Sequence, residues 1–342
     1  MRCTIVPPHI LDHLSREADD PALRESARRS LVISTAQRTE RRVLPVAAPT
    51  ATQDFTPHRT IDDAQHTETL PGRTVRTEGA AAVADPVENQ AYDWLGVVFD
   101  FYKTAYQRDS IDGAGLPMIS TVHYGQGYDN AFWNGKQMVY GDGDGTLFTE
   151  FTGPLEVTGH ELTHGVTQYT AALEYYGQSG ALNESISDVF GCLIKQWHLG
   201  QTADQAAWLI GEGLLAAGVH GEALRSMKAP GTAYDDPQLG KDPQPADMAH
   251  YVNTYRDNGG VHINSGIPNR AFYLAADAIG GHAWERAGRI WYGTLTGGKL
   301  SSSVDFAGFA AATVDTAGTL YGSSAAEVTA VRQAWTGVGV HV

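Results

Sequence analysis

The stretch VTGHELTHGV at residues 157–166 limits the possible folds of this chain more than any other part of it. His160 and His164 lie four positions apart, which on a helix puts both side chains on one face, about 5–6 Å apart at Cβ. Two imidazoles with this spacing can bind one Zn²⁺, with Glu161 beside them and directed at a metal-bound water. The pattern therefore predicts a helix that carries a zinc centre. Two surface histidines on an amphipathic helix are the alternative.

A third metal ligand is expected further along, in GALNESISDVFG at residues 180–191. Catalytic zinc usually takes three protein ligands and leaves one position for water. Glu184 and Asp188 share a helix face, so one carboxylate can bind the metal while the other accepts the free ring N–H of a ligand histidine. Asn183, beside Glu184, is a further candidate for such a hydrogen bond. Acidic residues that stabilise a helix N-terminus are the alternative, but the histidine pair upstream favours the metal interpretation.

The composition is typical of a globular protein that does not bind nucleic acid or membranes. Hydrophobic residues make up 42% and charged residues 18% of the 342 residues. No apolar run approaches the roughly 20 residues of a membrane-spanning helix. The net charge is −15: residues 1–60 hold 9 lysines and arginines against 7 acidic residues, and the remainder holds 15 against 32. Such an acidic body disfavours nucleic acid and anionic membrane surfaces as partners.

The first residues, MRCTIVPPHIL, lack the pattern of an export signal. A signal peptide needs a continuous apolar run of about 7–15 residues, and Pro7 and Pro8 interrupt any such run. We therefore expect no signal peptide of the usual secretory kind, and either a cytoplasmic location or export by another route. Cys3 and Cys192 are the two cysteines, which does not indicate a disulfide framework.

Along the chain, strand patterns precede helical patterns. Two helical stretches over residues 9–34 are followed by a linker rich in Pro, Thr and Ala. A hairpin is expected around Pro71, a helix from Asp85, and mainly helices from Glu156 onward. This order predicts an α+β fold with a cleft where its halves meet. The expected parts are a leader with its linker at 1–58, a β-rich lobe at 59–155 and a mainly helical lobe at 156–342.

Five ordered stretches together resemble the thermolysin-like neutral zinc metallopeptidases, over nearly everything after about residue 59. They are NAFWNGKQMVYGDGDG, GHELTHGVTQY, SGALNESISDVFG, LRSM and DNGGVHINSGIPNRAFY. The resemblance implies a two-lobed α+β fold, one catalytic zinc on the central helix in the cleft, and endopeptidase activity. The short leader with its Pro-Pro motif resembles the compact protealysin type.

The resemblance also implies a role for each matching residue. Glu161 would be the general base that takes a proton from the metal-bound water and passes it to the leaving amine. His262, oriented by Asp257, and Tyr175 would stabilise the oxyanion. Without the resemblance, His262 would be a core or loop histidine. The implied zinc ligands are His160, His164 and Glu184.

Substrate contacts are implied in the same way. Asn130, the Ala131 backbone and Arg225 would hold the substrate main chain extended; taken alone, Asn130 is equally a turn residue and Arg225 a surface cation. Cleavage is expected on the amino side of bulky apolar residues, because the implied pocket is apolar and is lined by Phe148, Phe151, Val157 and Leu224.

One family feature is altered here. Many relatives bind a pair of calcium ions between the zinc helices, but Lys195 stands where a bridging carboxylate would be, and Leu209 replaces another acid. An ammonium can neutralise the remaining carboxylates in place of metal, so we expect Lys195 to pair with Glu156 or Glu212 and calcium to be absent from this paired site, although calcium elsewhere stays possible. The alternative is a Lys195 that extends to solvent. The stretch YGDGDG begins like a calcium loop, but it lacks the later ligands, which favours a turn.

The leader is best interpreted as an inhibitory prosegment that lies in the cleft. Pro7 and Pro8 favour an extended backbone and remove amide N–H groups that a substrate presents. Maturation is expected within 38–58, and the expected partners are peptide or protein substrates and the prosegment itself. A Cys3 thiolate that caps the zinc is an alternative lock. The alternative function is that of a catalytically silent homologue that acts as a binding or regulatory scaffold. A peptidase restricted to chain ends would need acidic groups that bind a free amine, and no motif in the sequence indicates them.

Overall fold

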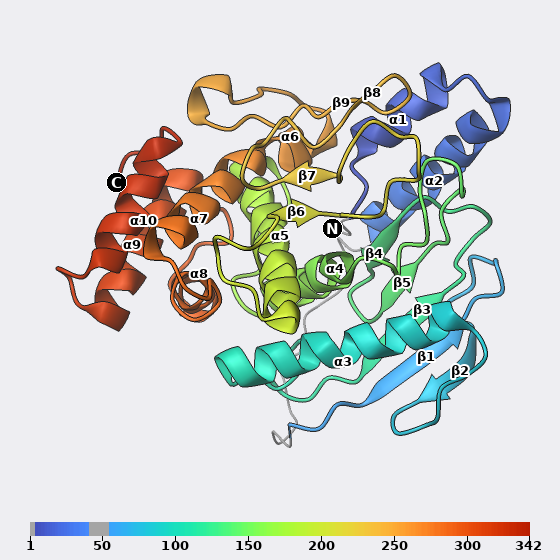
Figure 1. The fold of residues 1–342 in the computed structure, drawn as a ribbon, viewed down its shortest axis with the longest axis horizontal. Helices are drawn as coiled ribbons and strands as arrows, with labels where there is room; N and C mark the ends of the chain where they lie inside the picture. Colours follow the sequence, from blue (N-terminus) through green and yellow to red (C-terminus); the bar gives the residue numbers. More distant parts are fainter. Residues whose placement is uncertain (1–3, 41–54) are drawn as a thin grey trace.

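The computed structural model describes residues 4–40 and 55–342 and has an α+β fold (Figure 1). Cys3 and most of the predicted maturation range lie outside the described residues. The leader forms two helices, α1 (Pro8–Glu17) and α2 (Pro21–Glu40). Each begins with a proline, whose fixed φ suits the first turn and whose missing N–H is not needed there. α2 runs past residue 34, the predicted end of the helical stretch.

A five-stranded mixed sheet forms the core of the first half. Its strands, in the spatial order β2-β1-β3-β5-β4, are β1 (Arg59–Asp63), β2 (Arg73–Thr77), β3 (Met118–Val122), β4 (Ala131–Trp133) and β5 (Met138–Tyr140). β1, β3 and β5 are parallel neighbours, whereas β2 and β4 pair antiparallel at the two edges. β1 and β2 are the hairpin expected around Pro71. The carboxyl ends of the three parallel strands therefore lie along one edge.

Helix α3 (Pro86–Tyr106) runs along this sheet (Figure 1). The side chain of Asp85 caps it by accepting the Val87 N–H at 2.8 Å, and Pro86 opens the first turn. Apolar residues at helical spacing, such as Leu95 and Phe99, are buried. The helix starts where the Asp-Pro pair predicted.

Two long buried helices, α4 (Leu155–Gln168) and α5 (Gly177–Leu199), pack against each other in the middle of the molecule. Glycines permit the close approach: a Cβ on Gly191 would lie 2.7 Å from the Glu156 carbonyl oxygen, and one on Gly159 would lie 3.0 Å from Gly191 Cα. Any larger residue would push the helices apart. This contact fixes the distance between the ligand-bearing faces.

The rest of the second half consists of short strands and five further α-helices. Its elements are β6 (Leu209–Ile210), β7 (Arg225–Ser226), β8 (Asp235–Asp236), β9 (Gly240–Lys241), η2 (Met248–His250), α6 (Asp257–Asn264), α7 (Gly266–Ile279), α8 (Ala287–Thr296), α9 (Phe306–Tyr321) and α10 (Ala326–Gly337). The mixed sheet followed by a mainly helical half is the α+β architecture expected from the sequence.

The YGDGDG stretch forms a turn after β5. Asp144 Oδ1 accepts the backbone N–H groups of Thr146, Leu147 and Phe148 at 2.7, 2.6 and 3.2 Å. An aspartate used in this way closes a turn. The geometry agrees with the turn interpretation.

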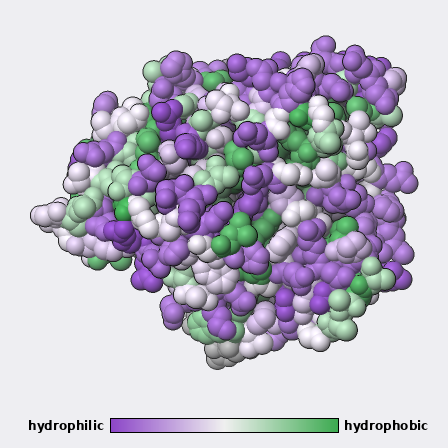
Figure 2. Space-filling view, viewed as in Figure 1, coloured by the Kyte–Doolittle hydropathy of each residue, from purple (hydrophilic) through white to green (hydrophobic). Residues whose placement is uncertain are grey.

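The face drawn in Figure 2 is mostly hydrophilic, with small separate groups of hydrophobic residues. None of the described helices is both long and apolar enough to span a membrane.

Candidate metal centre

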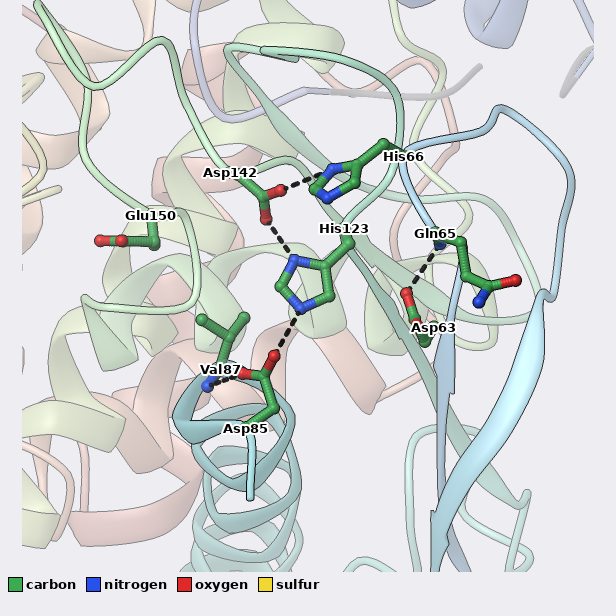
Figure 3. Close-up of a pocket in the computed structure, with 8 residues that line it drawn as sticks. All are labelled: Asp63, Gln65, His66, Asp85, Val87, His123, Asp142 and Glu150. Carbon is green, nitrogen blue, oxygen red and sulfur yellow. Dashed lines mark hydrogen bonds and ion pairs between the residues drawn. The ribbon is translucent and has the colours of Figure 1, made fainter. Parts of the chain in front are cut away.

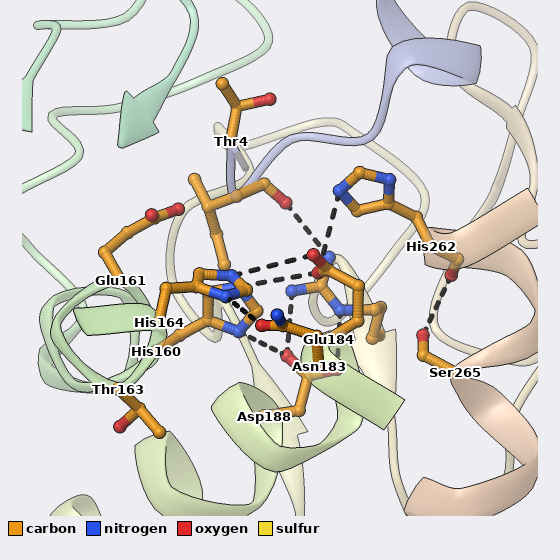
Figure 4. Close-up of polar contacts among 12 residues, drawn as sticks. Thr4, His160, Glu161, Thr163, His164, Asn183, Glu184, Asp188, His262 and Ser265 are labelled. Atoms are coloured by element: carbon orange, nitrogen blue, oxygen red, sulfur yellow. Dashed lines mark hydrogen bonds and ion pairs between the residues drawn. The ribbon is translucent and has the colours of Figure 1, made fainter. Parts of the chain in front are cut away.

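The two histidines of α4 face a glutamate of α5 (Figure 4). His160 Nε2 and His164 Nε2 are 3.0 Å apart, and each is 3.6 Å from a carboxylate oxygen of Glu184. One ligand atom from each residue lies within 4.8 Å of the others, and all three side chains are buried. The structure thus brings together the three residues that the motifs selected.

The hydrogen bonds behind the histidines decide which ring nitrogens face the centre. His160 Nδ1 is 2.7 Å from Asp188 Oδ1, and His164 Nδ1 is 2.8 Å from Asn183 Oδ1. The Asn183 amide nitrogen donates to the Leu173 carbonyl, which fixes its oxygen toward His164. Both Nδ1 atoms therefore donate, and in the neutral rings both Nε2 lone pairs point at one position. Two lone pairs and a carboxylate fit a divalent zinc ion.

Asp188 also forms an ion pair with Arg225, a contact that was not predicted from the sequence. Its two oxygens accept Arg225 Nη2 and Nε at 2.9 Å each, and Oδ2 also accepts from Asn269 at 2.8 Å. Burial alone would raise the pKa of Asp188, but Arg225 and His160 outweigh it and hold this pKa well below its usual value. Asp188 stays ionised, so it can orient His160 and Arg225 together.

Glu161 is positioned from the sheet side of the centre. Its Oε2 accepts the backbone N–H of Trp133 at 2.9 Å, and its side chain is fully buried. Trp133 ends β4, so the edge strand of the sheet holds the carboxylate next to the histidine pair (Figure 4). The sequence could not reveal this backbone contact between residues 28 positions apart.

Tyr175 and His262 lie on the other side of Glu184. The Tyr175 hydroxyl donates to Glu184 and is 3.3 Å from His262 Nε2. Asp257 Oδ1 is 2.7 Å from His262 Nδ1, and its Oδ2 accepts the His262 backbone N–H at 2.9 Å. Burial opposes a charge on His262, but Asp257 and Glu184 outweigh it and raise its pKa. The arrangement places a phenol hydroxyl and an imidazole nitrogen side by side next to Glu184.

Models of two protein domains match the chain. Residues 46–168 match the catalytic domain of the thermolysin metallopeptidases, and residues 171–340 match their α-helical domain. The chain belongs to the thermolysin family of metallopeptidases. This confirms the resemblance inferred from the five motifs, and it makes the chain a metalloendopeptidase rather than a silent scaffold. Zinc is the metal expected in this family.

Similar proteins include precursors and exported enzymes. The precursor of protealysin, a metalloproteinase from Serratia proteamaculans, has a solved structure with 51% identity and a TM-score of 0.90, covering 99% of each chain. The extracellular metalloprotease of Pectobacterium carotovorum subsp. carotovorum is 52% identical over 347 residues, 99% of this chain and 97% of that protein. The extracellular minor metalloprotease of Serratia marcescens is 53% identical over 208 residues, 61% of this chain and 59% of that protein. The precursor match supports a thermolysin-family enzyme made with a prosegment.

The location predicted from the sequence was wrong. Two of these thermolysin-family relatives are named as extracellular, which points to export and contradicts a cytoplasmic enzyme. The prediction depended on the absence of one apolar pattern near the N-terminus. An absent pattern does not determine a compartment.

The leader of this thermolysin-family chain forms hydrogen bonds with the residues that were expected to hold a substrate backbone. Val6 N–H donates to Asn130 Oδ1 at 2.9 Å, and Asn130 Nδ2 donates to the Val6 carbonyl at 3.2 Å. Ile5 N–H donates to the Ala131 carbonyl at 3.1 Å, and Arg225 Nη1 donates to the Ile5 carbonyl at 3.0 Å. Ile5 and Val6 are fully buried. The next two residues are Pro7 and Pro8, and Pro8 begins α1.

The four residues expected to line the specificity pocket are buried together. They belong to the same apolar cluster as Ile5 and Val6, and they are Phe148, Phe151, Val157 and Leu224. The rings of the two phenylalanines are 6.0 Å apart.

Lys195 lies at the position where the resemblance implied a calcium-binding acid. Its Nζ is 3.1 Å from Glu156 Oε1 and 2.8 Å from Glu212 Oε2, and the Glu212 backbone N–H donates to the same Glu156 oxygen at 3.0 Å. Burial raises the pKa of Glu156 although Lys195 opposes this effect. The lysine therefore contacts both acids rather than extending away from them.

Proposed function

We propose that the centre hydrolyses internal peptide bonds on the amino side of bulky hydrophobic residues. The observation that carries this proposal is the set of two imidazole lone pairs and one carboxylate at one buried point, with Glu161 beside it. His160, His164 and Glu184 would hold the zinc, and Asp188 and Asn183 would orient the two histidines. When bound, zinc polarises the scissile carbonyl and lowers the pKa of an attacking water.

The proton transfers are assigned to Glu161. Its buried carboxylate takes a proton from the attacking water and delivers it to the leaving amine. The Trp133 N–H holds one oxygen of this carboxylate in place. A fixed carboxylate of this kind loses little entropy on the way to the transition state.

The developing oxyanion is assigned to Tyr175 and His262. Their donor atoms lie 3.3 Å apart beside Glu184, and in the proposed reaction both donate to one substrate oxygen. Asp257 is assigned to keep His262 protonated and correctly turned.

The leader is proposed to inhibit by occupying the substrate position. Residues 5 and 6 pair with Asn130, the Ala131 backbone and Arg225 as an extended peptide substrate would. Pro7 has no backbone N–H and so cannot form the next hydrogen bond that a substrate would form. The leader can therefore bind in the substrate position without being cleaved. The proposed parts of the chain are a prosegment and linker at 1–58, a β-rich lobe at 59–155 and a mainly helical lobe at 156–342.

Two further proposals concern metal content and location. Lys195 is proposed to replace the paired calcium ions by neutralising Glu156 and Glu212, which leaves zinc as the single metal that catalysis needs. Because the named relatives are extracellular, the enzyme is proposed to be exported.

Hydrolysis of casein and of a peptide blocked at both ends, by chains cut with trypsin in the linker, tests the proposed function. Phenanthroline should abolish both reactions and added zinc should restore them. Cleavage of the blocked peptide excludes an enzyme restricted to chain ends. Activity that survives complete zinc removal would refute the proposal.

A further inference from the structure

Away from the zinc centre, two histidines and an aspartate meet at one edge of the sheet (Figure 3). His66 follows β1, His123 follows β3 and Asp142 follows β5. Because these strands are parallel neighbours, their carboxyl ends present the three side chains to the same place. Asp142 Oδ1 is 2.9 Å from His123 Nδ1, and Asp142 Oδ2 is 3.2 Å from His66 Nδ1. One ligand atom from each residue lies within 4.8 Å of the others.

We propose that His66, His123 and Asp142 bind a second zinc ion. Two imidazole nitrogens and a carboxylate oxygen are a ligand set that zinc takes in proteins. The ion takes the place of the proton between His123 Nδ1 and Asp142 Oδ1, and that proton is released to solvent. The three residues border an open pocket of about 530 Å³, which leaves room for water at the fourth position.

Asp85 supports His123 as a metal ligand. Its Oδ2 is 3.2 Å from His123 Nε2, the ring nitrogen that does not face Asp142 (Figure 3). A carboxylate there accepts the remaining N–H of a metal-bound imidazole, which fixes the tautomer and makes the ligand more basic. Asp188 has the same relation to His160 in the zinc centre. Asp85 is itself fixed, because its other oxygen caps α3 through the Val87 N–H.

Backbone hydrogen bonds hold the ligand loops together before any ion binds. His66 N–H donates to the His123 carbonyl at 2.8 Å, and Tyr124 N–H donates to the Tyr140 carbonyl at 3.1 Å. The first bond joins the loops after β1 and β3, and the second joins the loop after β3 to the last residue of β5. Both histidines have positive φ, 57° and 53°, a conformation that non-glycine residues adopt rarely and often at functional sites. The ligands are therefore preorganised.

The pocket also has the charge that a cation requires. Among the described residues that line it, four are acidic and none is a lysine or arginine; the acids are Asp63, Asp85, Asp142 and Glu150. The His66 side chain is 58% exposed, so an ion can enter from solvent without any change in the core. The site is thus accessible, negative and separate from the catalytic helices.

The number of zinc ions per full-length chain tests this proposal. Chains stripped with a chelator are dialysed against buffered zinc in the micromolar range, and zinc is measured by elemental analysis. We expect two ions in the wild type and one in His66→Ala. We also expect two in His220→Ala, the matched control, which removes an exposed histidine outside the pocket. A single ion in the wild type, or two ions in His66→Ala, would overturn the proposal.

Two further variants separate this site from its neighbours. In a His160→Ala/His164→Ala chain, zinc should still raise the melting temperature, because an ion that binds only the folded state stabilises it. Adding His66→Ala should remove that rise. Asp85, Glu88 and His123 form a neighbouring ligand set. Loss of the second ion in Glu88→Gln, with retention in His66→Ala, would assign it to that set and overturn the proposal.

Discussion

Arg225 and Asp188 form a buried, two-pronged ion pair, with Arg225 Nε and Nη2 each 2.9 Å from a different carboxylate oxygen. The same carboxylate faces the ring of His160, and the remaining guanidinium nitrogen donates to the Ile5 carbonyl. One ion pair therefore connects His160, a proposed zinc ligand, with Ile5 of the leader.

Asp188→Asn should weaken zinc binding by about 10–100-fold, because His160 loses the carboxylate that orients it. Competition with a chromophoric chelator measures this affinity. The variant should also lose about 3 kcal/mol of stability, because Arg225 is left buried without its counter-charge. Asp235→Asn is the control, since this aspartate is 75% exposed, and it should change neither quantity. Wild-type zinc affinity in Asp188→Asn would contradict the assigned role.

Replacement of Pro7 and Pro8 by alanine should make the precursor active or cause it to cut its own prosegment. The change restores N–H groups to the backbone that follows Val6, so the bound segment becomes a substrate. Hydrolysis of a blocked peptide by the uncut chain, with N-terminal sequencing, provides the measurement. Cys3→Ala is the matched control and should stay as latent as the wild type. Activation by Cys3→Ala alone would instead favour inhibition by a Cys3 thiolate that binds the zinc.

Calcium should leave the melting temperature of the wild type unchanged, because Lys195 neutralises Glu156 and Glu212. Lys195→Met should cost about 3 kcal/mol, since it leaves the buried Glu156 without its counter-charge. Lys241→Met, at a residue 69% exposed, should cost less than about 0.5 kcal/mol. Denaturant unfolding with and without calcium measures these effects. A clear calcium-dependent rise for the wild type would refute the replacement.

Asp257→Asn should move the alkaline limb of kcat/KM to lower pH. Asp257 helps to raise the pKa of His262, so the imidazole stays protonated, and able to donate, to higher pH in the wild type. Activity should fall as pH rises through this pKa, and loss of the negative charge should bring the fall earlier. The pH profile of blocked-peptide hydrolysis measures the shift. An unchanged alkaline limb would argue against His262 as the protonated donor.

Local spacing predicted which side chains would meet at the candidate zinc centre. His160 and His164 are one helical turn apart, and Glu184 and Asp188 repeat that spacing, so helix geometry alone puts each pair on one face. The α+β class followed from the order of strand and helix patterns. These features depend on neighbours within one element.

Contacts between distant elements were not predictable in this way. Two such contacts are the hydrogen bond from the Trp133 N–H to Glu161 and that from the Asn269 amide to Asp188. They depend on how the edge strand β4 and the later helix α7 pack against α4 and α5. The cluster of His66, His123 and Asp142 depends on three parallel strands ending side by side, and strand order is not encoded in any single stretch.

The most direct test of the account compares wild type and Glu161→Gln, both opened by trypsin in the arginine-containing linker. Zinc content and hydrolysis of a peptide blocked at both ends are measured on the same samples. The account predicts equal zinc content and a rate at least about 100-fold lower in Glu161→Gln, since only the proton-transferring group is lost. Full zinc content with a rate near that of the wild type would contradict it.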